Sequence, residues 1–205
     1  IPQATAVPVS WAQSSCATVP TGKYFRIRVE HSGQAINVPQ NSTAQGEIVV
    51  QSRPNGTMSE NWRFEEIGES SYYTILNQNS GKALRSNLGD NGAISQSTIL
   101  AGEESMYWCF QPVGESHYKI VNLLSGAAIA VPESSQVEGQ PLKDLMAGSR
   151  YRSNMVWALE ESSDPETPAP TFPVPTPIPQ ATAVPLWTQS SCATVPTGKY
   201  FRIRV

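Results

Sequence analysis

Apolar and polar residues alternate along this chain in short runs, and one run of this kind occurs three times. Each copy begins with an aromatic residue and has isoleucine two positions later, then a Ser-Gly step and a short apolar segment. The copies read FRIRVEHSGQAI from Phe25, YTILNQNSGKAL from Tyr73 and YKIVNLLSGAAI from Tyr118. Because side chains of a strand alternate between its two faces, each aromatic-x-Ile pair places two large side chains on one face. The pattern predicts β-strands separated by turns, and no stretch carries the period of a helix.

Two further signals follow each run. A glycine precedes a second short segment in each copy, at Gly46, Gly92 and Gly139. Each copy then closes on Trp-x-apolar, at Trp62, Trp108 and Trp157. The Ser-Gly steps predict hairpin turns, where glycine tolerates a positive φ. Three copies of about four strands each predict an all-β fold, a closed barrel with pseudo-threefold symmetry and a cap of hairpins.

These motifs resemble those of the ricin-B-type β-trefoil lectin family. The resemblance covers about residues 24–161 and rests on aromatic-x-Ile, Ser-Gly-x-x-Leu/Ile, Gly and Trp-x-Phe/Leu occurring three times in series. It implies a β-trefoil fold. It also implies sugar binding with up to one site per copy, in a module of the kind appended to secreted enzymes or toxins.

The resemblance also implies where sugar ligands would be held. The family places an acidic residue just after the Ser-Gly-x-x-Leu step, and its closing motif is Gln-x-Trp. This sequence has Asn37, Arg85 and Ala130 at the first position, and Glu60, Met106 and Met155 at the glutamine position. Only the first copy keeps polar groups at both, so Asn37 and Glu60 form the candidate residual sugar site. The alternative is that both are ordinary turn residues on a scaffold that has lost its binding role.

A longer repetition extends across the whole chain. Residues 14–29 recur letter for letter at 190–205, and IPQATAVP at Ile1 returns at Ile178. This near-identity predicts a tandem array with a period of about 177 residues. The expected organisation is an N-terminal arm at 1–23, a β-trefoil domain at 24–161, a Pro/Thr-rich linker and next arm at 162–199, and the first strand of the next unit at 200–205.

The tract Asp164–Pro185 has proline at nearly every second or third position. Such a composition favours extended polyproline II, a semi-rigid spacer of about 3 Å per residue. Threonines beside prolines are candidates for O-glycosylation, namely Thr167, Thr171, Thr176 and Thr182. Two sequons, at Asn41 and Asn55, are candidates for N-glycosylation.

One unit contains two cysteines, Cys16 and Cys109, and Cys192 repeats Cys16 in the following unit. Trp108 and Phe110 are expected to face inward, which turns Cys109 outward. An outward thiol in an exported module is better suited to a disulfide than to a free thiol. Either Cys16 or Cys192 could be its partner, because the entropy of loop closure grows only logarithmically with length. Cys16 is the favoured partner, and the pairing with Cys192 stays open. Disulfide chemistry predicts an extracellular or cell-surface location.

Composition and sequence motifs argue against several classes of function. The net charge of −3 gives no electrostatic basis for nucleic-acid binding, and no run of about 20 apolar residues predicts a membrane span. No catalytic residues, metal ligands or cofactor motif are predicted: the two histidines, His31 and His117, are isolated, and adjacent glutamates on a strand point to opposite faces. The chain is therefore not expected to be an enzyme.

Two function classes remain. The first is a structural repeat unit of a secreted fibre or surface stalk, whose partners are neighbouring copies and covalent glycans. The second is a carbohydrate-binding module, repeated so that weak sites gain strength by tethering.

Overall fold

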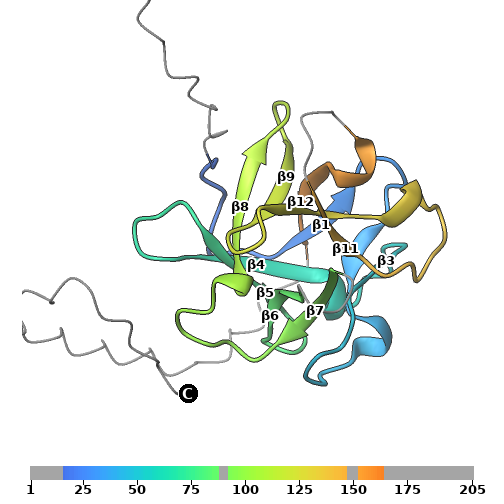
Figure 1. Cartoon of the computed structure of the whole chain (residues 1–205). Helices are drawn as coiled ribbons and strands as arrows, with labels where there is room; N and C mark the ends of the chain where they lie inside the picture. The colour runs from blue at the N-terminus through green and yellow to red at the C-terminus, as the bar shows by residue number, and fades with distance from the viewer. Residues whose placement is uncertain (1–15, 88–91, 147–151, 164–205) are drawn as a thin grey trace, which may run out of the picture. The chain divides into compact units, whose positions relative to one another are not determined.

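Six strands close into a barrel in the computed structural model, which describes residues 16–87, 92–146 and 152–163 (Figure 1). The barrel strands are β1 (Phe25–Val29), β4 (Asn61–Glu66), β5 (Tyr73–Asn77), β8 (Tyr107–Pro112), β9 (His117–Asn122) and β12 (Trp157–Glu161). Each pairs antiparallel with the next in that order, and β12 pairs back with β1. This closure removes the open sheet edges of the barrel.

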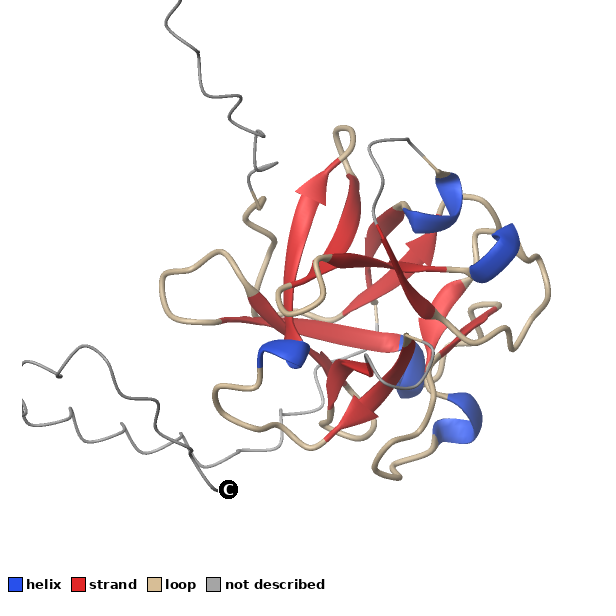
Figure 2. Cartoon of the chain, in the orientation of Figure 1, coloured by secondary structure: helices blue, strands red, loops and turns tan. Residues whose placement is uncertain are grey.

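The other six described strands form three hairpins. They are β2 (Ala35–Asn37) with β3 (Val50–Ser52), β6 (Ala83–Asn87) with β7 (Ala93–Ser97), and β10 (Ala127–Ala130) with β11 (Lys143–Met146). Short 3-10 turns are the only helical segments among the described residues (Figure 2). They are η1 (Pro39–Asn41), η2 (Met58–Glu60), η3 (Glu104–Met106), η4 (Pro132–Ser134) and η5 (Ser153–Met155). The predicted all-β trefoil of twelve strands is confirmed.

The three tryptophans occupy equivalent places in the core. All are fully buried, and each indole N–H donates to a backbone carbonyl of its own hairpin. The donor–acceptor distances are 2.9 Å from Trp62 to Ile36, 3.0 Å from Trp108 to Leu84 and 2.9 Å from Trp157 to Ile129. The residue that follows Ser-Gly-x-Ala in sequence is therefore the hydrogen-bond partner of the closing tryptophan in every copy.

A ring of three backbone hydrogen bonds joins the hairpins. The N–H of Val49 donates to Ile94 at 2.9 Å, Ile94 to Leu142 at 3.1 Å, and Leu142 back to Val49 at 3.0 Å. All three side chains are fully buried. The ring shows which residues are equivalent under the pseudo-threefold axis. It also joins the three hairpins of the cap to one another.

Glycine serves the turns in two different ways. At the Ser-Gly steps, Gly33, Gly81 and Gly126 have φ values of 68°, 66° and 64°, as the predicted hairpin turns require. The later glycine of the second copy is not equivalent to those of the other copies, because Gly46 and Gly139 lie three residues before their ring members and Gly92 lies two before Ile94. A Cβ at Gly92 would lie 2.9 Å from the backbone oxygen of Asp144, so close approach also restricts this position.

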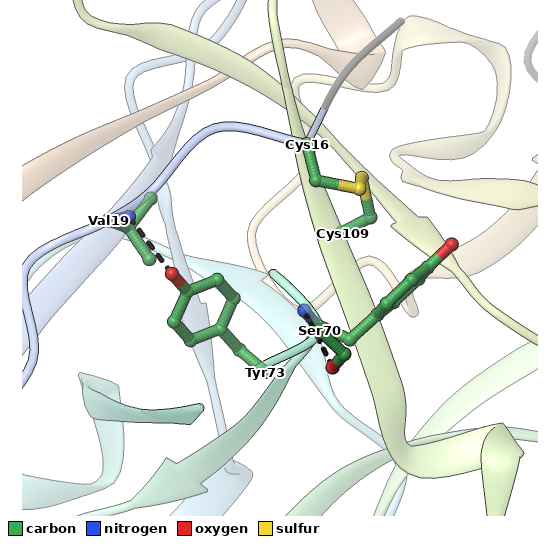
Figure 3. Close-up of a disulfide and its surroundings, with 6 residues drawn as sticks. Cys16, Val19, Ser70, Tyr73 and Cys109 are labelled. Atoms are coloured by element: carbon green, nitrogen blue, oxygen red, sulfur yellow. Dashed lines mark hydrogen bonds between the residues drawn. A yellow bond between two sulfur atoms is a disulfide. The ribbon is translucent and has the colours of Figure 1, made fainter. Parts of the chain in front are cut away.

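The N-terminal arm is fastened to the barrel by a disulfide between Cys16 and Cys109, whose Cα atoms are 5.3 Å apart (Figure 3). The flanking Trp108 and Phe110 point into the core as predicted, but Cys109 is only 2% exposed because the arm covers it. Of the two pairings that the sequence leaves open, the structure contains the one with Cys16. Cys192 and the four candidate threonines lie outside the described residues.

Candidate functional site

The sequence-predicted sugar positions lie where each hairpin meets the 3-10 turn that precedes the closing tryptophan. β2 contacts η2, β6 contacts η3 and β10 contacts η5. Asn37 and Glu60 therefore belong to neighbouring elements, as do the corresponding residues of the other copies. The three places share one backbone frame but have different chemistry.

In the first copy, Glu60 is fully buried and its carboxylate is held by protein donors. It accepts from the Arg26 Nε at 2.8 Å and from the backbone N–H groups of Asn55 and Gly56, both at 2.9 Å. These contacts tie β1 to the turn before η2. The described contacts of Glu60 are those of a structural anion.

Asn37 has a different environment. It is 6% exposed and lies opposite Val50 in the β2–β3 pairing. Its amide oxygen is buried and has no hydrogen-bond partner among the described residues. Such a group costs free energy unless something satisfies it. The amide oxygen of Asn37 is therefore the acceptor of the Asn37–Glu60 pair that the described protein groups leave without a donor.

Both sequon asparagines border the same place, which the sequence alone did not indicate. Ser59 Oγ donates to Asn41 Oδ1 at 2.8 Å, and Thr57 Oγ1 donates to Asn55 Oδ1 at 2.7 Å. The two hydroxyls are 2.9 Å apart. A chain of polar side chains thus links Asn41 to Asn55, and both asparagines are exposed.

The second copy is charged at its surface. Arg85 Nε donates to Ser105 Oγ at 3.2 Å, and Ser105 Oγ donates to Glu103 Oε1 at 2.7 Å. The Ser105 hydrogen bond, aided by the Arg85 charge, holds the pKa of Glu103 below its usual value. Beneath this chain, Met106 is fully buried beside Leu76. The position of Arg85 suggested no such cluster, because its partners come from a turn about 20 residues later.

The third copy is apolar. Ala130 and Met155 pack in one cluster with Val121 and Ala128, and Leu145 lies against it. Nothing in that cluster can donate to or accept from a sugar hydroxyl through a side chain. The three equivalent places therefore hold a structural ion pair, a surface polar chain and an apolar cluster.

Other polar groups that the sequence singled out have protein partners. His31 Nε2 lies 2.8 Å from the carbonyl of Ser135, and Glu160 and Glu161 pair with Arg28 and Lys23 at 3.0 and 2.7 Å. The described residues contain no group of three histidine, cysteine or carboxylate side chains that could hold a metal ion. Within the same residues, no helix is both long and apolar enough to cross a membrane.

Replacing Glu60 by glutamine is expected to lower the free energy of unfolding by about 3 kcal/mol. The amide cannot accept from three donors as the carboxylate does, and it leaves the Arg26 charge in a largely buried place. Urea unfolding of E60Q measures the effect, and E66Q at the exposed end of β4 is the matched control. A loss below about 0.5 kcal/mol would show that the carboxylate is free for a ligand.

One partly buried carboxylate, that of Asp144, stands where the other two copies have glutamine. Gln51 donates from its amide to the carbonyls of Ser135 and Val137, and Gln96 does the same to Ser42 and Ala44, at 2.8 to 2.9 Å. These residues follow the ring members Val49 and Ile94 by two positions, and Asp144 follows Leu142 likewise. In two copies the glutamine amide therefore donates to two loop carbonyls. A carboxylate in the third copy cannot donate such hydrogen bonds.

Asp144 accepts from the hydroxyls of Ser86 and Ser125, but its Oδ1 is buried without a partner among the described residues. Burial raises the pKa of Asp144 despite these two hydrogen bonds. The folded protein therefore holds a proton on Asp144 more tightly than the unfolded chain does. The stability that comes from this preference is present at acid pH and is lost as the pH rises through the raised pKa.

D144N is therefore expected to stabilise the protein by about 1 kcal/mol at pH 7 and to leave its stability nearly unchanged at pH 3. Urea unfolding at the two pH values measures the difference. E69Q, which removes an exposed carboxylate, controls for net charge. A D144N protein that is destabilised equally at both pH values would contradict this account of the site.

Comparison with known proteins finds one matching family model and several similar solved structures. A family model described as "Ricin-type beta-trefoil lectin domain-like" matches residues 11–96 and 59–145. No curated relative matches the chain in sequence. A designed threefold-symmetric protein, ThreeFoil, superposes with a TM-score of 0.61 and 27% identity, over 67% of this chain and 97% of the design.

Two further solved structures are similar to this chain. An exo-β-1,3-galactanase from Clostridium thermocellum matches with a TM-score of 0.64 and 26% identity over 71% of this chain, which spans only 31% of the galactanase. The ricin B-like lectin of Macrolepiota procera, solved in complex with lactose, matches with a TM-score of 0.59 over 71% of this chain and all of the lectin. At 12% identity, that likeness shows the fold alone.

Proposed function

Because this chain belongs to the ricin-type β-trefoil lectin-like family, we propose that it is a lectin-derived structural module. It would be the repeat unit of a secreted extracellular fibre or surface stalk built from tandem trefoils. Its partners would be neighbouring copies of the same unit and covalent glycans. The family supplies a compact closed barrel, and the array would use that barrel as a building block.

The observation that carries this proposal is the letter-for-letter return of residues 14–29 at 190–205. Identity over that length marks a repeat unit rather than an ancient duplication inside a fold. The proposed organisation is an arm at 1–23, the trefoil at 24–161, a linker with the next arm at 162–199, and the next first strand at 200–205. The fibre would consist of successive units of this kind, each joined to the next through the linker and arm.

The chemistry of the three sugar positions supports a structural role. A sugar site needs a few polar groups converging in a concavity. Glu60 is committed to Arg26 and two backbone donors, and Met106 and Met155 are packed in apolar clusters. An ion pair at Glu60 and apolar packing at Met106 and Met155 therefore occupy positions that could otherwise hold a ligand.

Connection between units would run through arms and linkers, because a closed barrel has no free edge for strand addition. The tract Asp164–Pro185 could reach roughly 70 Å at about 3.1 Å per residue in polyproline II. A compact domain of about 140 residues is only some 35 to 40 Å across. The tract is therefore long enough to pass one barrel and continue into the next unit.

Glycosylation of the linker and of Asn41 or Asn55 belongs to the same proposal. Only 15% of the residues are charged, and attached sugar would solubilise such a surface without repulsion between units. The exposure of both asparagines supports their use as acceptors. Mass spectrometry of the natural protein is expected to find added hexose mass on peptides spanning 164–185. Peptide masses that match the unmodified sequence across that tract would contradict glycosylation of the linker.

An extracellular or cell-surface location would fit this proposed role. The Cys16–Cys109 disulfide is compatible with an extracellular or cell-surface environment, since cytosolic conditions keep most thiols reduced.

The second candidate function is a multivalent carbohydrate-binding module, as the family itself suggests. The unpartnered amide oxygen of Asn37 favours it, and so does the Arg85–Ser105–Glu103 chain on the second copy. A residual Asn37–Glu60 site would need the Glu60 carboxylate to leave Arg26, which makes Asn37 the residue to test.

A glycan array with the 205-residue chain separates the two functions. The structural proposal expects no glycan bound with a Kd below about 1 mM, and the same result for N37A and R85A. Micromolar binding that N37A or R85A abolishes would establish the carbohydrate-binding module instead. The matched control S70A changes a hydroxyl in an exposed turn away from these positions.

A further inference from the structure

The arm that precedes β1 docks on a defined place on the barrel, formed by Cys109 and Phe110 of β8 and Tyr73 of β5. This place is called the arm socket below. Cys16 is joined to Cys109, and Ala17 N–H donates to the Phe110 carbonyl at 2.7 Å. Figure 3 shows Val19 beside Tyr73, whose hydroxyl accepts from the Val19 N–H at 3.4 Å.

The socket recognises little of the arm besides its backbone, one sulfur and one apolar side chain. Val19 is 2% exposed and packs in the main core cluster. Thr18, between the bonded residues, is exposed. A segment with the sequence Cys-Ala-x-Val therefore carries every contact described here.

The chain contains a second segment of that sequence, Cys192–Val195, within the repeated residues 190–205. We propose that the arm socket also binds this second arm, with a Cys109–Cys192 disulfide replacing Cys16–Cys109. Only the consequence for neighbouring units rests on the proposed tandem array. The docking itself is a property of this chain.

The first arm should hold the socket most of the time because it is tethered more closely. Six positions separate Val19 from Phe25 of β1, whereas about thirty separate Ser163 from Val195. Loop-closure entropy then favours the first arm about tenfold. Because the second arm has the same sequence, its contacts in the socket would be the same, so about one socket in ten should hold the second arm when disulfides can exchange.

The exchange is chemically balanced. The Cys192 thiolate attacks the Cys109 sulfur, the Cys109–Cys192 bond forms, and the bond to Cys16 breaks as Cys16 leaves as a thiolate. No net oxidant is consumed. Because Cys109 is 2% exposed, the first arm must undock before the attack.

In a tandem array this exchange would brace one barrel covalently to the arm of the following unit. The arm socket would then be a site of linkage between units as well as the anchor of each barrel's own arm. Its occupant would decide whether neighbouring units are linked only through the main chain or also through sulfur.

Peptide mapping of the unglycosylated 205-residue chain, equilibrated in a buffer of reduced and oxidised glutathione, tests the proposal. Trypsin releases Cys16, Cys109 and Cys192 on peptides 1–23, 86–119 and 153–199, which differ in mass. The wild type is expected to show about one Cys109–Cys192 link for ten Cys16–Cys109 links. C16S is expected to convert most of Cys109 to the Cys192 link, with oxidised glutathione as the oxidant.

V195D within C16S is the matched control, since it alters only the second arm and should reduce the Cys192 link at least fivefold. V19D, which weakens the first arm and keeps all three cysteines, should make the Cys192 link the major species even if C16S folds poorly. Free Cys109 in C16S, an unchanged link in V195D, or a link found only between chains on a non-reducing gel would overturn the proposal.

Discussion

Replacing Cys16 and Cys109 together by serine is expected to lower the free energy of unfolding by about 4 kcal/mol. The disulfide joins residues 93 positions apart, so its loss frees a long loop in the unfolded chain. It also releases the arm that places Val19 in the core. Guanidinium unfolding of C16S/C109S, with C192S added to remove the third thiol, measures the loss.

The control for this variant is C192S alone, which leaves the bond intact and should unfold as the wild type does. V19A separates the arm's packing from the cross-link, and it should cost about 1 to 2 kcal/mol by itself. A C16S/C109S protein within 1 kcal/mol of the wild type would show that the cross-link contributes little to the stability of the fold.

Truncating any one of the three core tryptophans is expected to cost about 4 kcal/mol. Each side chain is fully buried, and each donates to the backbone of its own hairpin. Alanine leaves a large cavity and a carbonyl without its donor. Because the three environments are equivalent, W62A, W108A and W157A should agree within about 1 kcal/mol of one another.

Phenylalanine at the same positions separates the two contributions. It keeps most of the ring but removes the indole N–H, and it is expected to cost about 2 kcal/mol. Urea unfolding of the six variants provides the comparison. A single tryptophan whose removal costs less than 1 kcal/mol would contradict the equivalence of the three copies.

Local pattern was enough to predict the barrel. Period-two alternation fixed the inward faces, the Ser-Gly steps gave turns with positive φ, and the spacing of Trp62, Trp108 and Trp157 gave the threefold relation. Gly92 precedes its strand as the pattern predicted, but it is not equivalent to Gly46 and Gly139, because the second copy is one residue shorter between its glycine and the ring of cap hydrogen bonds.

The chemistry of the candidate site was harder to predict from the sequence than the barrel. Glu60 has its charged partner 34 residues away on β1, and a motif comparison within one copy cannot show such a contact. The Arg85–Ser105–Glu103 chain and the partly buried Asp144 likewise depend on which turns fold together. For the disulfide, identical arm sequences and similar sequence separations did not exclude Cys192, although Cys16, the partner found in the structure, was favoured.

Small-angle scattering from two complete units in tandem, with residue 205 continuing into a second copy of residues 30–163, tests the proposed fibre most directly. The account predicts one narrow distribution of distances between the two barrels. It also predicts that replacing Asp164–Pro185 by a Gly/Ser tract of equal length broadens that distribution. A broad distribution that does not change with the replacement, as for two barrels on a flexible chain, would contradict the account.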